Sequence, residues 1–223
     1  MSDGAPAVVI MARAPRRGTV HLALEPLIGP EGCISLHTAL LLRTTAWARE
    51  VARERVFVAY EPADARAELT TLLGVPATYF PQNGDGIASR TAAASAQVFA
   101  TGERPLLIVW PVLAGLTASH AAGALDDLAV GCDVVLGPVF EGGLYLVGVK
   151  RPAPVLFGLP ERSWRSAELV SIAVATAQKS GLQIGLLRTE RALLRPADVR
   201  SALADPLLAP ELARVLRRSQ RIG

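Results

Sequence analysis

Hydrophobic residues in this chain form short continuous runs that alternate with longer stretches of helical spacing. The runs are short enough for buried strands and are bounded by glycine, proline or polar residues. They lie at residues 7–12, 56–60, 77–80, 105–110, 134–136, 144–149 and 183–187. Helical spacing predicts helices at 30–54 and 62–73, from a first turn at Arg90 to Thr101, at 117–128, and from Ser166 to Gly181. This alternation predicts a mostly parallel sheet with helices on both faces.

The length and composition of the chain predict one domain. With 223 residues, of which 51% are hydrophobic, the chain can bury one α/β core and is too short for two ordinary ones. We expect a single domain over residues 1–223, with a core at about 7–204 and a helical tail at 205–223.

Charge and hydropathy exclude several classes of partner. The net charge of +3 and the aromatic content of 5% are too small to predict nucleic-acid binding. The first apolar run is too short for a signal peptide, and no run approaches the length of a membrane span. We therefore expect a cytoplasmic protein. The mean hydropathy of +0.34 leaves a homodimer open.

The loop after the first strand is rich in charge. Arg13, Arg16, Arg17 and His21 follow the run at 7–12 within a stretch that also holds Pro15 and Gly18. The carboxyl end of a first strand is where open α/β sheets place nucleotides, and guanidinium groups bind phosphate well. Solvated loop arginines are the other interpretation.

A second candidate lies between the runs at 134–136 and 144–149. Its sequence is Gly137-Pro138-Val139-Phe140-Glu141-Gly142-Gly143. Paired glycines adopt positive φ and allow close approach, and the neighbouring carboxylate supplies charge. Spacing alone leaves a ligand site and a bulged hairpin with a solvated Glu141 equally open.

Several motifs in this order resemble those of a bacterial family of glycosyltransferase-like proteins, described as radical-SAM-associated or arsenosugar-type transferases. The family motif G-P-x-x-D-G-G-x-Y-L-x-G is matched by Gly137, Pro138, Gly142, Gly143, Tyr145, Leu146 and Gly148, with Glu141 at the Asp position. Further matches include Ala12, Ala14, Pro15, Gly18, Gln82 and Arg90. The resemblance implies a single-domain GT-A fold, the Rossmann-like fold of nucleotide-diphospho-sugar transferases, with a mixed, mostly parallel sheet.

The resemblance also implies a set of site residues. The nucleotide- or diphosphate-binding residues would be Ala12, Arg13, Ala14, Arg16, Arg17, Gly18, His21, Asp85 and Arg90. Gly142, Gly143 and Tyr145 would form a substrate loop, and Glu141 would be the catalytic residue, as a general base or a sugar-binding carboxylate.

The departures from the family motifs concern chemistry more than scaffold. Val112, Ala192 and Leu194 occupy positions where the family has acidic residues, one of which holds a divalent cation. Apolar side chains cannot coordinate magnesium or manganese, which need oxygen ligands. We therefore expect no metal site and no cofactor.

Three functions follow from the resemblance. The favoured one is a pseudoenzyme that has lost metal-dependent catalysis and binds a nucleotide, a nucleotide-sugar or a partner enzyme. The alternative is a metal-independent glycosyl or related group transferase, in which Arg16, Arg17, His21 and Arg90 stabilise the leaving diphosphate. A nucleotidyltransferase ranks third, because it needs the same metal and this loop lacks that group's glycine-rich run.

Overall fold

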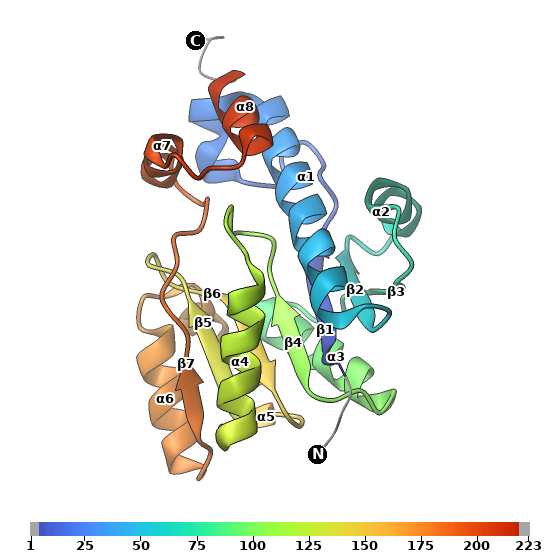
Figure 1. Ribbon diagram of the computed structural model, residues 1–223, viewed down its shortest axis with the longest axis vertical. Helices are drawn as coiled ribbons and strands as arrows, with labels where there is room; N and C mark the ends of the chain where they lie inside the picture. The colour runs from blue at the N-terminus through green and yellow to red at the C-terminus, as the bar shows by residue number, and fades with distance from the viewer. Residues whose placement is uncertain (1–4, 219–223) are drawn as a thin grey trace.

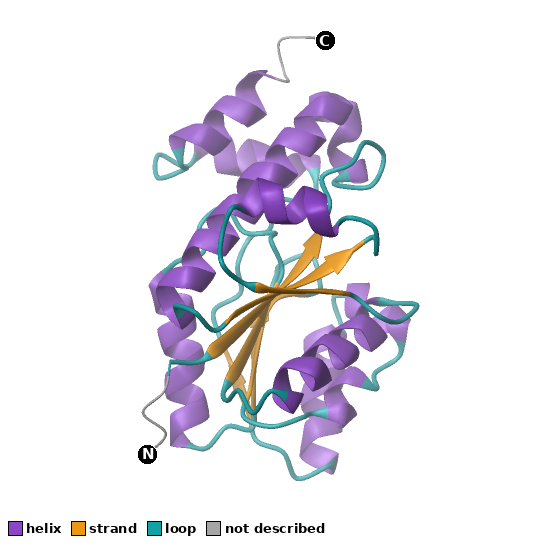
Figure 2. Ribbon diagram, turned by 90° about the vertical axis from the view of Figure 1, so that its right-hand side faces the viewer, coloured by secondary structure: helices purple, strands orange, loops and turns teal. Residues whose placement is uncertain are grey.

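A seven-stranded sheet runs through the middle of the molecule in the order β3-β2-β1-β4-β6-β5-β7 (Figures 1 and 2). The computed structural model describes residues 5–218. The strands are β1 (Ala7–Arg13), β2 (Val56–Glu61), β3 (Thr78–Pro81), β4 (Leu106–Val109), β5 (Val134–Pro138), β6 (Leu144–Val149) and β7 (Ile184–Leu186). Strand β6 is antiparallel to β4 and β5, and the other pairings are parallel. The predicted mixed, mostly parallel sheet is confirmed.

Helices cover both faces of the sheet, as Figure 2 shows with the sheet nearly edge-on. One face packs against α1 (Glu25–Ala52), α2 (Arg66–Leu73) and α4 (Ala118–Val130). The other packs against α3 (Ile87–Ala100), α5 (Pro154–Phe157) and α6 (Leu169–Lys179). Short 3₁₀ helices η1 (Leu22–Leu24) and η2 (Glu161–Arg165) lie in the loops. The structure is a single mixed α/β domain.

Strand β1 shows why the sheet needs cover on both sides. Val8 and Ile10 pack into the core on one face, and Val9 and Met11 pack into the core on the other. A strand buried on both faces reads as a continuous apolar run rather than an alternating one. This is the pattern from which the strand was predicted.

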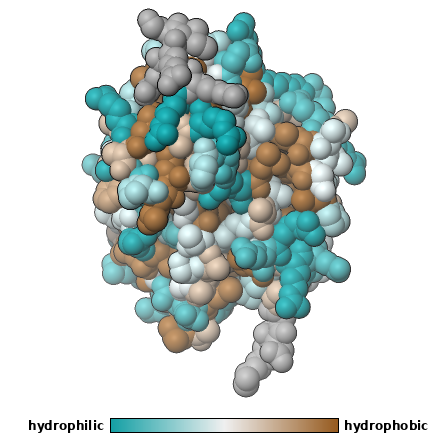
Figure 3. All heavy atoms as spheres, turned by 45° about the horizontal axis from the view of Figure 1, so that its top comes forward, coloured by the Kyte–Doolittle hydropathy of each residue, from teal (hydrophilic) through white to brown (hydrophobic). Residues whose placement is uncertain are grey.

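The last two helices, α7 (Pro196–Ala204) and α8 (Pro210–Arg218), lie beside the first part of α1 (Figure 1). Leu212 and Leu216 of α8 are fully buried in a third apolar cluster that includes Leu36 and Leu40 of α1. Figure 3 shows that hydrophobic side chains on this end of the molecule form separate patches among hydrophilic ones. No helix in the described part of the chain is long and apolar enough to cross a membrane.

Three helix starts differ from the sequence prediction. The first long helix begins at Glu25 and kinks at Gly29, whose φ of 68° is left-handed. Helix α2 begins at Arg66, four residues later than predicted. Helix α6 begins at Leu169 because the Ser166 hydroxyl accepts the N–H of Glu168 in a local turn instead of capping the helix.

Candidate nucleotide-binding cleft

A cleft of about 590 Å³ opens at the carboxyl ends of β1, β2, β3 and β4. Strand β1 lies between β2 and β4, so the chain leaves β1 toward one side of the sheet and later returns to its other side. Open α/β sheets bind ligands in the crevice at such a switch point. The volume lies in the range of pockets that hold small molecules, which run from about 300 to 1,000 Å³.

Two arginines converge on one carboxylate in this cleft. Arg13, at the end of β1, donates from Nε to Glu61 Oε1 over 2.7 Å, and Arg90 of α3 pairs with Glu61 Oε2. Each guanidinium is also fixed by a backbone carbonyl at 2.9 Å, that of Thr19 for Arg13 and that of Gly84 for Arg90. The cations are therefore held in place with their charge partly neutralised.

Gln82 fixes the loop after β3 to the neighbouring strands. Its side-chain amide donates to the carbonyl oxygens of Ala12 and Ala59, at 3.0 and 2.9 Å. Because these carbonyls lie near the carboxyl ends of β1 and β2, the contact sets the floor of the cleft. Asp85 in the same loop and Arg90 in the first turn of α3 also line the cleft.

A pair of histidines forms another wall of the cleft. His37 Nδ1 lies 3.2 Å from His21 Nε2, and His37 Nε2 lies 3.0 Å from the carbonyl oxygen of Arg13. Burial lowers the pKa of His21 to about 4, against a smaller opposite effect of the Leu193 backbone. Burial, with a further contribution from His21, lowers the pKa of His37 to about 3. Both rings are therefore neutral at neutral pH in the free protein.

The first turn of α3 is capped by a carboxylate from a distant part of the chain. Glu161 of η2 accepts the backbone N–H groups of Ile87 and Ala88, at 2.8 and 3.1 Å. The amino end of a helix favours negative charge, so Glu161 takes the place that a ligand's anionic group would favour. A Cβ on Gly86 would lie 2.3 Å from Glu161 Oε2, so a larger residue there would displace the carboxylate.

The remaining wall of the cleft is apolar and includes two of the three substituted acidic positions. Val112 and Leu194 line the cleft beside Trp110. Ala192 is 5% exposed and pairs with Leu113 in an isolated antiparallel bridge. Across the described residues, no group of three or more His, Cys, Asp or Glu side chains is arranged to hold a metal ion.

The structure brings together Arg13, His21, Asp85 and Arg90 of the predicted binding residues. Arg16 instead pairs with Asp64 and Glu68, and Arg17 pairs with Glu31 at 3.3 Å. The remaining predicted residues of this loop are not part of the cleft lining: Ala12 and Ala14 are fully buried, and Gly18 has a φ of 70°.

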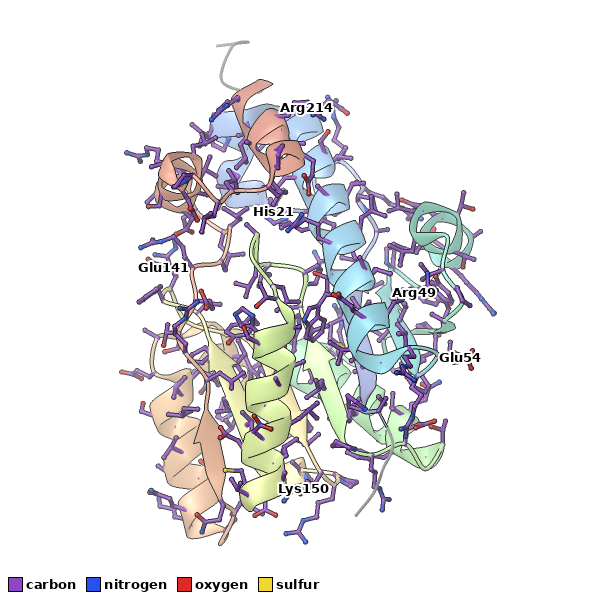
Figure 4. The ribbon with its side chains drawn as sticks, viewed as in Figure 1. His21, Arg49, Glu54, Glu141, Lys150 and Arg214 are labelled. Carbon is purple, nitrogen blue, oxygen red and sulfur yellow. The ribbon has the colours of Figure 1, made fainter. Side chains whose placement is uncertain are left out.

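The predicted substrate loop lies outside the cleft lining. Glu141 forms an ion pair with Arg195 and lies at the loop between β5 and β6, to the left of His21 in Figure 4. Tyr145 is fully buried. Gly142 has a φ of 88°, and a Cβ there would meet the Ser166 backbone at 2.7 Å. The close approach that this glycine allows is therefore to another segment of the same chain, and β5 and β6 form a hairpin with a register shift at its bulge.

The cleft lining includes residues that were not predicted, among them His37, Glu61, Gln82 and Glu161. Glu61 directly follows the predicted strand at 56–60. Its position at the carboxyl end of a strand could therefore have identified it as a candidate site residue. Gln82 matched a family motif but was not assigned to the site. Glu161 lies 74 residues after Ile87, and no local pattern indicates their contact.

The chain shares its fold with structures of the nucleotide-diphospho-sugar transferase type. A solved structure from Desulfovibrio desulfuricans G20, named provisionally as a nucleotide-diphospho-sugar transferase, superimposes with a TM-score of 0.85, at 20% identity over 98% of this chain and 96% of that one. The chain belongs to the family of uncharacterized proteins conserved in bacteria known as DUF2064, whose profile matches residues 44–164. No curated protein matches the sequence.

Two more distant structures share the fold. For 4-diphosphocytidyl-2C-methyl-D-erythritol synthase the TM-score is 0.55, at 14% identity over 92% of this chain and 100% of that one. For CMP:2-keto-3-deoxy-manno-octonic acid synthetase, solved with CTP, the TM-score is 0.53, at 14% identity over 90% and 98%. These TM-scores show a common fold.

Proposed function

We propose that this protein binds a nucleotide or nucleotide-sugar in the cleft without a divalent cation, and that it has lost metal-dependent transferase chemistry. The observation that carries the proposal is the convergence of Arg13 and Arg90 at the switch point of the sheet. Both guanidinium groups are fixed by backbone carbonyls and face the cleft, as a site for phosphate oxygens requires. The fold relative solved with CTP supports a nucleotide as the ligand class.

The apolar wall supports the loss of metal-dependent chemistry. Val112 and Leu194 face the cleft at positions where the resemblance places acidic residues. Trp110 offers an aromatic surface beside them for a base or a sugar ring. A diphosphate would therefore be held by guanidinium groups rather than through a bridging cation.

A calorimetric titration with UDP and GDP in the presence of EDTA tests the proposal. We expect binding by the wild type and at least a tenfold loss in Arg90→Gln, because one charged phosphate contact contributes about 1.5–3 kcal/mol. Arg151→Gln is the matched control, since Arg151 pairs with Asp133 beside the amino end of β5, at the opposite end of the strands from the cleft. Equal affinities in wild type and Arg90→Gln contradict the assignment of the site.

Group transfer without a divalent cation is a second candidate, favoured by the same pair of arginines, which could stabilise a leaving diphosphate. Its narrower form, a radical-SAM-associated or arsenosugar-type transferase, stays a prediction. Asp85 lines the cleft and is the candidate carboxylate for a sugar or acceptor hydroxyl, whereas Glu141 pairs with Arg195. Turnover of UDP-glucose in EDTA that is lost in Asp85→Asn would support transfer over binding alone.

A further inference from the structure

The charges that line the cleft do not by themselves favour a diphosphate. Arg13 and Arg90 face the cleft together with the carboxylates of Glu61, Asp85 and Glu161, so these groups carry a formal excess of negative charge. Both arginines are already paired with Glu61. A ligand that brings two more negative charges therefore needs a further source of positive charge in the cleft.

The hydrogen bonds of the histidine pair fix where its protons lie. The carbonyl of Arg13 can only accept, so His37 Nε2 carries a proton and donates to it over 3.0 Å. A neutral His37 then has a bare Nδ1, which accepts from His21 Nε2 over 3.2 Å. Neutral His21 has used its single proton in that contact, and its Nδ1 is left with a lone pair.

One added proton has a place to bind in this arrangement. The backbone of Leu193 raises the pKa of His21, which is the effect of an acceptor that faces the ring. A proton on His21 Nδ1 would leave both existing contacts intact, the one between the two rings and the one from His37 to the carbonyl of Arg13. Burial opposes this protonation in the free protein. The pair is therefore a proton site that is empty until another charge favours its occupation.

We infer that the His21–His37 pair takes up one proton when an anionic nucleotide-sugar binds, and that the resulting imidazolium supplies the positive charge that the cleft lacks. This inference rests on the proposed function of the cleft. Both histidines line the same cavity as the two arginines, so a bound diphosphate lies in the same low-dielectric space. The ligand class is a nucleotide-sugar, whose diphosphate charge is not compensated by Arg13 and Arg90.

The groups around the pair define what else could titrate. The backbone carbonyl of Arg13 raises the pKa of His37, and the charge of the Arg13 side chain lowers it by less. The Cys33 thiol of α1 donates to the carbonyl of His21. Across the cleft lie Glu61, Asp85, Arg90 and Glu161. Measurements at pH 5.5 to 8 span the ordinary pKa of histidine, so they report on the pair.

The test is the affinity for UDP-glucose between pH 5.5 and 8, measured by calorimetry in EDTA. The two phosphates of this ligand are both esterified, so its charge is constant over that range. By linkage, uptake of one proton makes binding stronger at low pH, and the affinity falls by up to about tenfold per pH unit as pH rises through the pKa of the complex. Titrations in buffers of different ionisation enthalpy should show net proton uptake over the same range.

Two variants assign the proton to the pair. His21→Asn keeps a residue that tolerates the φ of 48° at this position, and His37→Gln keeps a polar side chain within α1. Each should bind UDP-glucose with an affinity that is flat over the range, and a thermal melt checks that each is folded. The wild-type pH dependence in both folded variants, or a pH-independent affinity in the wild type, overturns the inference alone. Failure of every nucleotide and nucleotide-sugar to bind overturns the proposed function and the inference with it.

Discussion

Arg13 and Glu61 face each other at the last register position of β1 and β2, and their side chains meet at 2.6 Å in the cleft. The contact joins two neighbouring strand ends on the side of β1 away from β4. Arg90 completes it from α3 on the other oxygen of the same carboxylate. In the free protein Glu61 thus occupies guanidinium groups that a phosphate would use.

Replacing Glu61 by Gln should therefore raise the affinity for UDP. The neutral amide leaves Arg13 and Arg90 uncompensated, so we expect an affinity gain of roughly tenfold and a loss of stability of about 1 kcal/mol. Calorimetry and urea denaturation measure the two effects. Glu103→Gln is a matched control, because Glu103 pairs with Arg55 and its side chain is 25% exposed, against 20% for Glu61. A weaker affinity in Glu61→Gln would show that Glu61 positions the arginines rather than competes with the ligand.

The carboxylate on the amino end of α3 leads to a second prediction. Glu161→Gln removes the charge of this carboxylate. Gly86→Ala keeps the charge but displaces the carboxylate, since a Cβ on residue 86 would lie 2.3 Å from Glu161 Oε2. Both changes should strengthen UDP binding by several-fold, because an anion favours the freed helix end. Glu168→Gln, on an exposed residue near η2, is the control. Unchanged affinity in both variants would place the phosphates elsewhere in the cleft.

Sequence reasoning identified the scaffold of this site better than its chemistry. The strands were predicted from apolar runs, because a strand buried on both faces leaves an unambiguous local pattern. The carboxyl end of β1 was predicted to bind a ligand, and Arg13 at that end lines the cleft. Contacts such as Glu161 with α3, or Gly142 with the Ser166 backbone, depend on how distant segments fold together and leave no periodicity to detect.

The pair of histidines shows the same limit. His21 was predicted from its loop at a strand end, whereas His37 reads as an ordinary position in a long helix. Their rings are in contact because the loop that holds His21 lies against α1 at His37, sixteen residues further along the chain. Similarly, the motif containing Glu141 marks a tight hairpin, and its glycines serve the packing of the chain.

Protein stability should fall as pH decreases below about 6.5. His21 and His37 have folded-state pKa values of about 4 and about 3, below their ordinary value of 6.5, so the unfolded chain binds more protons between these limits. Each histidine then lowers the free energy of unfolding by about 1.4 kcal/mol for each pH unit below 6.5, until the pH reaches the pKa of that histidine in the folded protein. Urea denaturation at pH 7.5 and pH 5 measures the difference, and His37→Gln should reduce it. Equal stability at both pH values would contradict the buried neutral pair.

Restoring a carboxylate to the apolar wall should create cation dependence. In Val112→Asp an oxygen ligand faces the cleft, so manganese should strengthen UDP binding by about tenfold. Val112→Asn is the matched control, because it has similar size and no charge. If the control responds to manganese as strongly as Val112→Asp, the effect does not come from the new carboxylate.

The most direct test of the account is the affinity of the wild-type protein for UDP and GDP with EDTA and with manganese. The proposed cleft holds the diphosphate through Arg13 and Arg90, so we expect binding in EDTA that manganese leaves essentially unchanged. Binding that appears only with manganese would contradict the account and would place a cation on the cleft carboxylates, with Asp85 as the first candidate.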